Sequence, residues 1–199
     1  MTQLDDEWTR LAAIPPAMAD AVRPLLTAVT LSGYRRFLDR MVHYTRGSGA
    51  RLRWAAERAT TPARRGLFAE LAREEAGHHR LAEADLAAFG EAPSPEPPAL
   101  VSGFDAFWRA GDELTWLGAL FALESVAGHL GADARASLGR LGLRREQARF
   151  VLVHLDADLE HGAATAALVR AALGEAVRAA ATRAAAFWVE LHREALAEP

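Results

Sequence analysis

Cysteine is absent from this 199-residue chain. Disulfides, thiolate metal ligands and cysteine nucleophiles are therefore excluded, so any metal must be held by nitrogen and oxygen, which suit iron, manganese or zinc. The chain also lacks a signal-peptide pattern and a run of 18 apolar residues, and we therefore expect a cytoplasmic protein. Its net charge of −3 gives no electrostatic reason to expect nucleic acid or a membrane as a partner.

Strand-forming residues are scarce, and isoleucine occurs only once. Because Ala, Leu, Arg and Glu dominate, the composition predicts an all-α protein, in which we count about seven helices. The first long helix is expected from Met18 to Arg46 with a bend at Pro24, and a third from Pro62 to Phe89. We interpret residues 1–199 as one domain that contains a stiff proline-rich linker at 91–98.

The most informative pattern lies near the end of the chain, where His154, Asp158 and His161 follow one another at i, i+4 and i+7. On a helix, which we expect from Arg144 to Leu173, these side chains project from one face. The helical phase turns Asp158 inward and the nearby acidic residues 156 and 160 outward. A bound metal would offset the cost of burying these groups, whereas a polar stripe facing water or a salt-bridged groove is the alternative interpretation.

Two further segments place carboxylates and histidines on apolar helix faces. Glu75 and His78 form an E-x-x-H pair, with Glu74 and His79 on its flanks as substitutes if the helical phase shifts by one residue. Glu124 lies in the most apolar stretch of the chain, where a core side chain is expected. Each motif taken alone also has a simpler interpretation. The E-x-x-H pair can lie on a solvent-exposed helix face, and Glu124 can be a buried glutamate paired with an arginine.

Taken together, these groups exceed what one metal ion normally uses, whereas a bridged pair of ions takes this many protein ligands. The leading prediction is a site for two iron ions, with a manganese–iron pair as the alternative. Its predicted ligands are Glu75, His78, Glu124, His154, Asp158 and His161.

The order of these motifs, and above all the phrase Phe150-x3-His154-x3-Asp158-x2-His161, resembles the haem-oxygenase-like di-iron oxidases and oxygenases. The resemblance covers residues 20 to 195 and implies a haem-oxygenase-like helical bundle. It also implies Fe(II), O2 as cosubstrate and oxidation of a small organic substrate such as an amine, an amino acid or a fatty acid, as in natural-product biosynthesis. A small molecule is thus the expected partner, and a homodimer stays open.

One feature departs from that family, whose members typically add a glutamate from the first long helix. Asp39 and His43 are the available substitutes here, as a ligand, a proton donor or a substrate contact. Alternatively, both are solvated beside neighbouring arginines. Arg35 or Arg36 could hold a substrate carboxylate, although a solvated basic face is the alternative for them too.

Other functions on the same fold stay open. A haem-degrading oxygenase could use His43 and Gly128, but it would leave the remaining buried ligands unexplained. A cofactorless quinone-forming oxidase would retain histidines without a complete metal set, and a ferritin-like iron protein also combines carboxylates with E-x-x-H pairs. A thiaminase-type activity requires the missing cysteine. The last alternative is a helical binding protein without catalysis.

Overall fold

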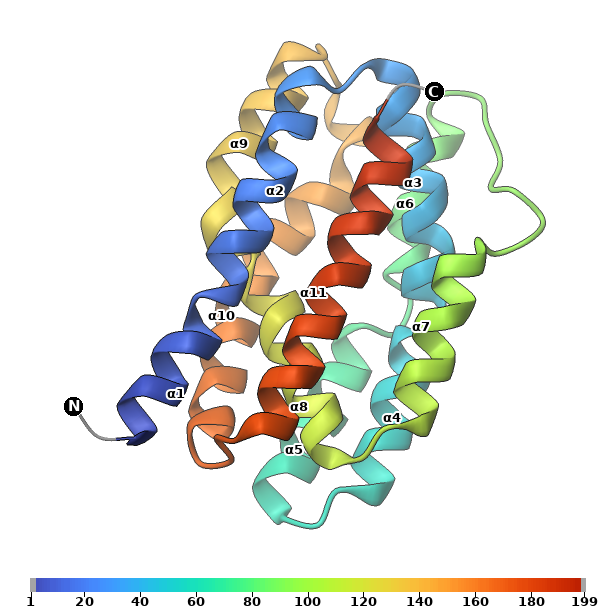
Figure 1. Cartoon of the computed structure of the whole chain (residues 1–199). Coiled ribbons are helices and arrows are strands. Elements are labelled where there is room, and N and C mark those ends of the chain that lie inside the picture. Colours follow the sequence, from blue (N-terminus) through green and yellow to red (C-terminus); the bar gives the residue numbers. More distant parts are fainter. Residues whose placement is uncertain (1–2, 198–199) are drawn as a thin grey trace.

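The computed structural model describes residues 3–197, and all regular structure in this part of the chain is helical. The elements are α1 (Gln3–Ala12), α2 (Ile14–Ala28), α3 (Leu31–Arg46), α4 (Ser48–Arg58), α5 (Pro62–Glu74), α6 (His79–Ala87), α7 (Ala99–Ala110), α8 (Glu113–Ser125), α9 (Ala127–Arg140), a 3-10 turn at Arg145–Gln147, α10 (Arg149–Arg170) and α11 (Glu175–Leu196). In four cases two consecutive helices continue in the same direction across a short break and together form one long helical segment: α1–α2, α3–α4, α5–α6 and α8–α9. Counted this way, the bundle has seven helical segments that run alternately up and down (Figure 1). The prediction of an all-α bundle of about seven helices is confirmed.

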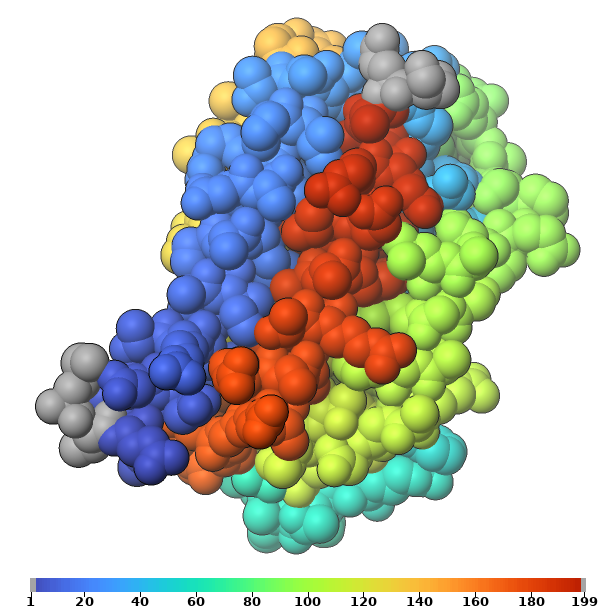
Figure 2. Space-filling view, viewed as in Figure 1, coloured from blue at the N-terminus to red at the C-terminus, as the bar shows by residue number. Residues whose placement is uncertain are grey.

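Helix α8 lies at the centre of the bundle and packs most extensively against α11 and α10. Its residues 116–123 are all buried, as expected for a helix that is apolar on every side. Gly118 permits the close approach of α11, because a Cβ atom there would collide with the carbonyl oxygen of Val177. On the molecular surface, α11 lies between α2 and α7 and closes one face of the core (Figure 2).

Two helices that were expected to be continuous are broken. The first breaks after Ala28 rather than at Pro24, because the Thr30 hydroxyl accepts a hydrogen bond from the Gly33 amide and caps a new helix, α3. The predicted helix from Pro62 to Phe89 is interrupted between α5 and α6, where Gly77 has a φ of +101°. The E-x-x-H pair therefore lies in a turn, not on a continuous helix.

Helix α10 begins at Arg149, later than the predicted Arg144, and its N-terminus is capped from another helix. The carboxylate of Asp85, on α6, is fully buried and accepts a hydrogen bond of 2.8 Å from the amide of Phe150. This position is favourable for a carboxylate, because the first amides of a helix lack hydrogen-bond partners and carry partial positive charge. None of the helices between residues 3 and 197 is long and apolar enough to cross a membrane.

Candidate metal centre

The structure gathers the six predicted ligands into two groups of three. Glu75, His78 and His154 form the histidine-rich group, in which the three potential ligand atoms lie within 4.8 Å of one another. The carboxylate-rich group consists of the remaining predicted ligands and meets the same limit; its members are Glu124, Asp158 and His161. Helix α10 contributes to both groups, the α5–α6 turn to the first and α8 to the second.

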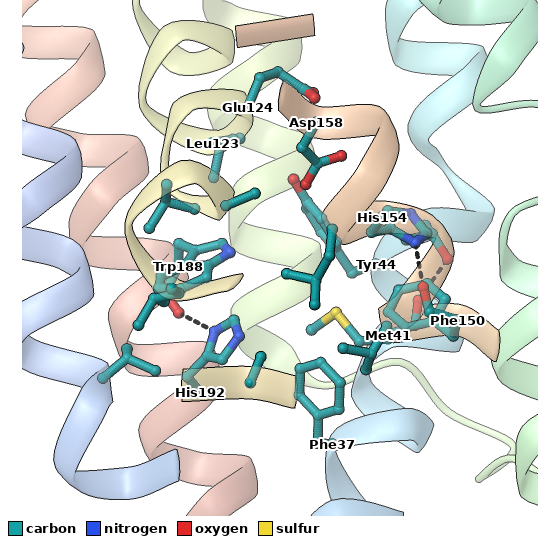
Figure 3. A pocket seen from close by; sticks show the side chains of 18 of the residues that line it. Phe37, Met41, Tyr44, Leu123, Glu124, Phe150, His154, Asp158, Trp188 and His192 are labelled. Carbon is teal, nitrogen blue, oxygen red and sulfur yellow. Dashed lines mark hydrogen bonds between the residues drawn. The ribbon is translucent and has the colours of Figure 1, made fainter. Parts of the chain in front are cut away.

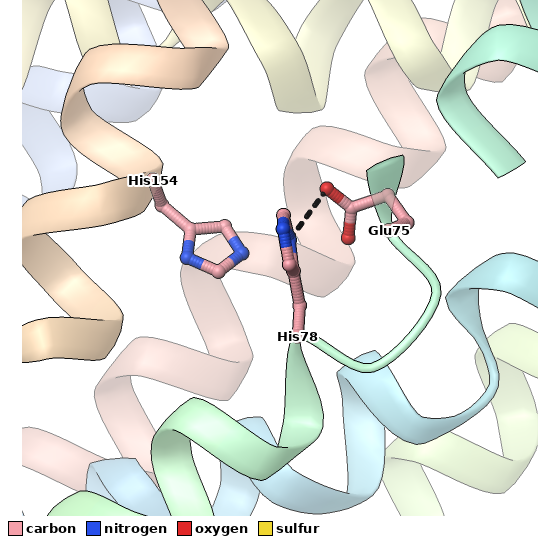
Figure 4. A group of neighbouring side chains, drawn as sticks. All are labelled: Glu75, His78 and His154. Carbon is pink, nitrogen blue, oxygen red and sulfur yellow. Dashed lines mark ion pairs between the residues drawn. The ribbon is translucent and has the colours of Figure 1, made fainter. Parts of the chain in front are cut away.

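In the histidine-rich group, two imidazoles meet edge to face beside one carboxylate (Figure 4). The rings of His78 and His154 have centroids 4.7 Å apart, and Nδ1 of His78 lies 2.9 Å from the carboxylate of Glu75. Nδ1 of His154 lies 2.7 Å from the carbonyl oxygen of Phe150; because a carbonyl can only accept, we assign the hydrogen to Nδ1. Nε2 of His154 is then a lone-pair acceptor, and it is buried without a hydrogen-bond partner among residues 3–197.

In the carboxylate-rich group, His161 lies between two acids. Its Nδ1 is 3.2 Å from Glu124, and its Nε2 is 2.6 Å from Glu74 on α5. The hydrogen bond to Glu124 raises the pKa of His161 to about 9, despite the opposing effect of burial. Burial raises the pKa of both Glu124 and Asp158, and the neighbouring carboxylates raise the pKa of Asp158 further.

The position of α10 against α8 depends on Gly162, which follows His161. A Cβ atom at Gly162 would lie 3.0 Å from the carbonyl oxygen of Glu124 and 3.2 Å from the Cα of Ser125. Both neighbours are backbone atoms and cannot rotate away. Glycine therefore allows α10 to approach α8 at the point where Glu124 and His161 meet.

The two groups are electrostatically linked. Burial alone would raise the pKa of Glu75, but its contact with His78 and the nearby imidazoles of His154 and His161 lower it overall. In turn, the negative charge of Glu75, in the other group, raises the pKa of Asp158. Buried acids next to an unpartnered imidazole nitrogen favour a bound cation. The donor set of imidazole and carboxylate fits iron, manganese or zinc, so these residues fit the predicted metal pair.

Both groups open onto one cavity of about 190 Å³, which is lined by Glu75, Glu124, His154 and Asp158 among mostly apolar side chains. Figure 3 shows the hydroxyl of Tyr44, on α3, directed towards Asp158. Burial raises the pKa of Tyr44, and the neighbouring carboxylates add to that effect, so its phenol keeps its proton at neutral pH. The first long helix thus presents a tyrosine, rather than a carboxylate, to the site.

The two residues predicted to complete the site from the first helix lie elsewhere. Asp39 accepts hydrogen bonds from the amide and hydroxyl of Ser94, at 2.7 and 3.0 Å, and Nε2 of His43 lies 3.0 Å from the same hydroxyl. Neither residue lines the cavity or joins either group. Asp39 and His43 instead hold Ser94 of the proline-rich linker, and their predicted catalytic role stays a prediction.

The arginines considered for substrate binding are also engaged away from the cavity. Arg35 pairs with Glu91 of the linker at 2.6 Å. Arg36 donates to the carbonyl oxygens of Ala195 and Ala197, at the end of α11. Neither of them lines the cavity.

The structure also places the other residues that the sequence offered as alternatives. Asp156 and Glu160 are exposed, as the helical phase predicted, whereas Asp158 lines the cavity. The E-x-x-H pair of the histidine-rich group is the one predicted, while the flanking Glu74 reaches the carboxylate-rich group through its contact with His161. Gly128, considered for a haem pocket, is exposed and lies outside the cavity lining.

Among the polar residues of the cavity wall that sequence reasoning missed are Tyr44, Trp188 and His192. A signal for the first was present, because Phe37, Met41 and Tyr44 recur at helical spacing and all line the cavity. The other two lie one turn apart on α11 and belong to the same kind of stripe.

Comparisons with known proteins agree with this architecture. The family model described as iron-containing redox enzyme matches residues 35–193, most of the chain, and the chain therefore belongs to that family. A domain of unknown function with a heme oxygenase-like fold, from Shewanella denitrificans, has a TM-score of 0.79 at 17% identity, covering 98% of this chain and 92% of that one. A TenA homologue from P. horikoshii OT3 has a TM-score of 0.75 at 15% identity, covering 98% and 99%. A CADD-like protein of unknown function from Nostoc punctiforme has a TM-score of 0.64 at 18% identity, covering 96% and 99%.

At these identities the solved structures show the fold alone, and the predicted haem-oxygenase-like fold is confirmed. No curated protein matches this chain.

Proposed function

We propose that this member of the iron-containing redox enzymes is a non-haem di-iron oxidase or oxygenase that uses O2 to oxidise a small organic substrate. One observation carries the proposal. Two linked groups of imidazole and carboxylate donors open onto the same mostly apolar cavity, and Nε2 of His154 is buried there with no partner in the described part of the chain. A protein-only structural role explains the histidine partners of Glu75 and Glu124, but within residues 3–197 it leaves that buried nitrogen unsatisfied.

The histidine-rich and carboxylate-rich groups would each hold one iron ion. Iron in these positions would supply the redox chemistry that activates O2, and the protein supplies ligand charge and a dry site. Glu75 provides the one carboxylate of the first group, whereas Glu124 and Asp158 provide two for the second. The unequal charge of the two groups would stabilise the oxidised metal more at the carboxylate-rich position.

The cavity determines which molecules can approach the metal groups. Its lining is mainly aliphatic and aromatic, so it excludes water and favours an apolar substrate. Among the described lining residues, Arg51 supplies the one guanidinium, and it is already engaged by Asp105 at 2.6 Å and by the carbonyl oxygen of Tyr44 at 2.8 Å. Tyr44 holds a proton next to Asp158, at the boundary between the cavity and the carboxylate-rich group.

The proposal is tested by O2 consumption of the Fe(II)-loaded protein in the presence of medium-chain fatty acids, their alcohols and amides, amino acids and amines. We expect at least one class to give consumption that depends on both Fe(II) and substrate. Asp158→Ala should abolish it, whereas Asp156→Ala, a matched change at an exposed position on the same helix, should not. Equal activity in the two variants, or iron binding without O2 consumption under any condition, would contradict the proposal.

A further inference from the structure

Helix α11 places two polar side chains in the wall of the cavity, across from His154 and Asp158 (Figure 3). They are Trp188 and His192, one helical turn apart. Nδ1 of His192 lies 2.8 Å from the carbonyl oxygen of Trp188. Because that carbonyl can only accept, Nδ1 carries the hydrogen and Nε2 is a hydrogen-bond acceptor.

The two side chains form a fixed donor–acceptor pair. Their rings are 3.8 Å apart between centroids and tilted by 36°, so the indole N–H and the imidazole Nε2 are held on neighbouring parts of the wall. Within residues 3–197, neither group makes a hydrogen bond. Burial lowers the pKa of His192 to about 4, so its imidazole is neutral at physiological pH. A donor and an acceptor that are unused in a mostly apolar cavity wall are free to bind the polar group of a ligand.

The charged groups in the cavity wall restrict which chemical group of a ligand could bind to Trp188 and His192. Arg51, the only guanidinium that residues 3–197 contribute to this wall, is bound by Asp105 and by two further oxygen atoms, of Tyr44 and Ser48. A carboxylate lying against α11 would therefore be buried without a free cation. A hydroxyl group or a primary carboxamide can instead donate to Nε2 of His192 and accept from the indole N–H.

The size of the cavity gives a second restriction. Its volume of about 190 Å³ is slightly larger than the roughly 150 Å³ of an apolar protein cavity that takes up benzene. The cavity therefore suits one small ring with a short substituent, or an aliphatic chain of similar volume.

We propose that Trp188 and His192 form an orienting subsite that binds the hydroxyl or carboxamide group of a small, uncharged, otherwise apolar substrate. The subsite would hold this polar group against α11 and leave the apolar body of the molecule directed towards the metal groups. Calling the ligand a substrate rests on the proposed function, but binding itself requires no metal.

The test uses the full chain freed of metal by chelation and two probes of matched shape, benzyl alcohol and ethylbenzene. Calorimetric titration gives the Kd of each probe for the wild type, His192→Leu and Trp188→Phe. We expect each substitution to weaken benzyl alcohol binding about tenfold, because one hydrogen bond is lost, and to leave ethylbenzene binding unchanged or tighter. Leu138→Met, which alters another part of the lining at similar volume, should affect both probes alike.

Two results would overturn the subsite. One is an equal loss for both probes in His192→Leu and Trp188→Phe, which would make the pair a packing element only. The other is a wild-type protein that binds neither probe. Circular dichroism and thermal unfolding confirm that each variant is folded before titration. A failure of the proposed function would give a different result from a failure of the subsite. The protein would bind the probes as expected but would take up no iron or consume no O2.

Discussion

His154 donates its Nδ1 hydrogen to the carbonyl oxygen of Phe150, one turn earlier on α10, over 2.7 Å. This bond fixes the orientation of the ring and leaves Nε2 as an unprotonated, buried acceptor facing His78 (Figure 4). Burial also lowers the pKa of His154, so the imidazole is neutral and available to a metal. Metal-binding histidines are commonly held in this way by a hydrogen bond from their second nitrogen.

The first prediction concerns the stability that metal adds. Addition of Mn(II) or anaerobic Fe(II) should raise the unfolding temperature of the wild type, because the ion binds only the folded state. His154→Ala should lose most of this increase. His129→Ala, a histidine substitution at an exposed position on α9, should retain it, as measured by thermal unfolding with and without metal. An equal increase in both variants would show that His154 is not a ligand.

The second prediction concerns Gly162, which lets α10 approach Glu124. Gly162→Ala should destabilise the fold by about 1–2 kcal/mol, since the clash with the α8 backbone outweighs a gain of about 1 kcal/mol in helix propensity. Metal affinity should fall as well, because the carboxylate-rich group is spread apart. Gly66→Ala, on α5, has open space around the added methyl group and should be neutral or stabilising in denaturant unfolding. The same effect in both variants would contradict the proposed role of Gly162.

The third prediction concerns the pH dependence of metal binding. The hydrogen bond to Glu124 raises the pKa of His161 to about 9, so below that pH the imidazolium must lose a proton before it can bind a metal. Apparent affinity for Mn(II) should therefore rise about tenfold per pH unit between pH 7 and 8.5. Proton release during calorimetric titration in buffers of different ionisation enthalpy measures the same effect. A pH-independent affinity without proton release would exclude His161 as a ligand.

The fourth prediction concerns the carboxylate that caps α10. Burial raises the folded-state pKa of Asp85 from 3.8 to about 6. As the pH rises, the unfolded chain releases this proton first, so the contribution of Asp85 to stability is full below pH 4 and lost by about pH 6. The stability of the metal-free wild type relative to Asp85→Asn should therefore decrease from pH 4 to pH 6 and then stay level. Denaturant unfolding across this range would contradict the assignment if the difference were constant.

The fifth prediction separates metal binding from turnover at the first long helix. Tyr44→Phe should retain full iron content but slow substrate-dependent O2 consumption about 100-fold, which is a typical contribution of a positioned proton donor. Tyr34→Phe is the matched control, because its hydroxyl donates to the carbonyl oxygen of Gln147 instead. Loss of iron from Tyr44→Phe, or equal rates in the two variants, would contradict this role.

The helical phase was enough to predict which groups of α10 face inward. Period 3.6 placed Asp158 in the interior and Asp156 at the surface, because a straight helix fixes the direction of every side chain. The same reasoning failed between α5 and α6, where Gly77 ends the periodicity. The turn still brings Glu75 and His78 together, so their predicted proximity does not depend on the helix boundary, and their role as ligands stays a prediction.

The contribution of the first long helix could not be predicted in this way. Asp39 and His43 share a helical face, and the segment that packs against this face is the proline-rich linker. Ser94 of the linker contacts both side chains. Which residue opposes a helical face depends on long-range packing, and one sequence contains no direct record of it. Trp188 and His192 share a helical stripe on α11, but the periodicity alone does not show that this stripe faces the cavity.

The central claim, that two metal ions occupy the histidine-rich and carboxylate-rich groups, is tested most directly by crystallography of the Fe(II)-loaded protein at the iron absorption edge. We predict two anomalous peaks in each chain, one bound by Nε2 of His154 and the other by the carboxylate of Asp158. Asp158→Ala should remove the second peak and keep the first. A single peak, or peaks bound by neither residue, would contradict the account.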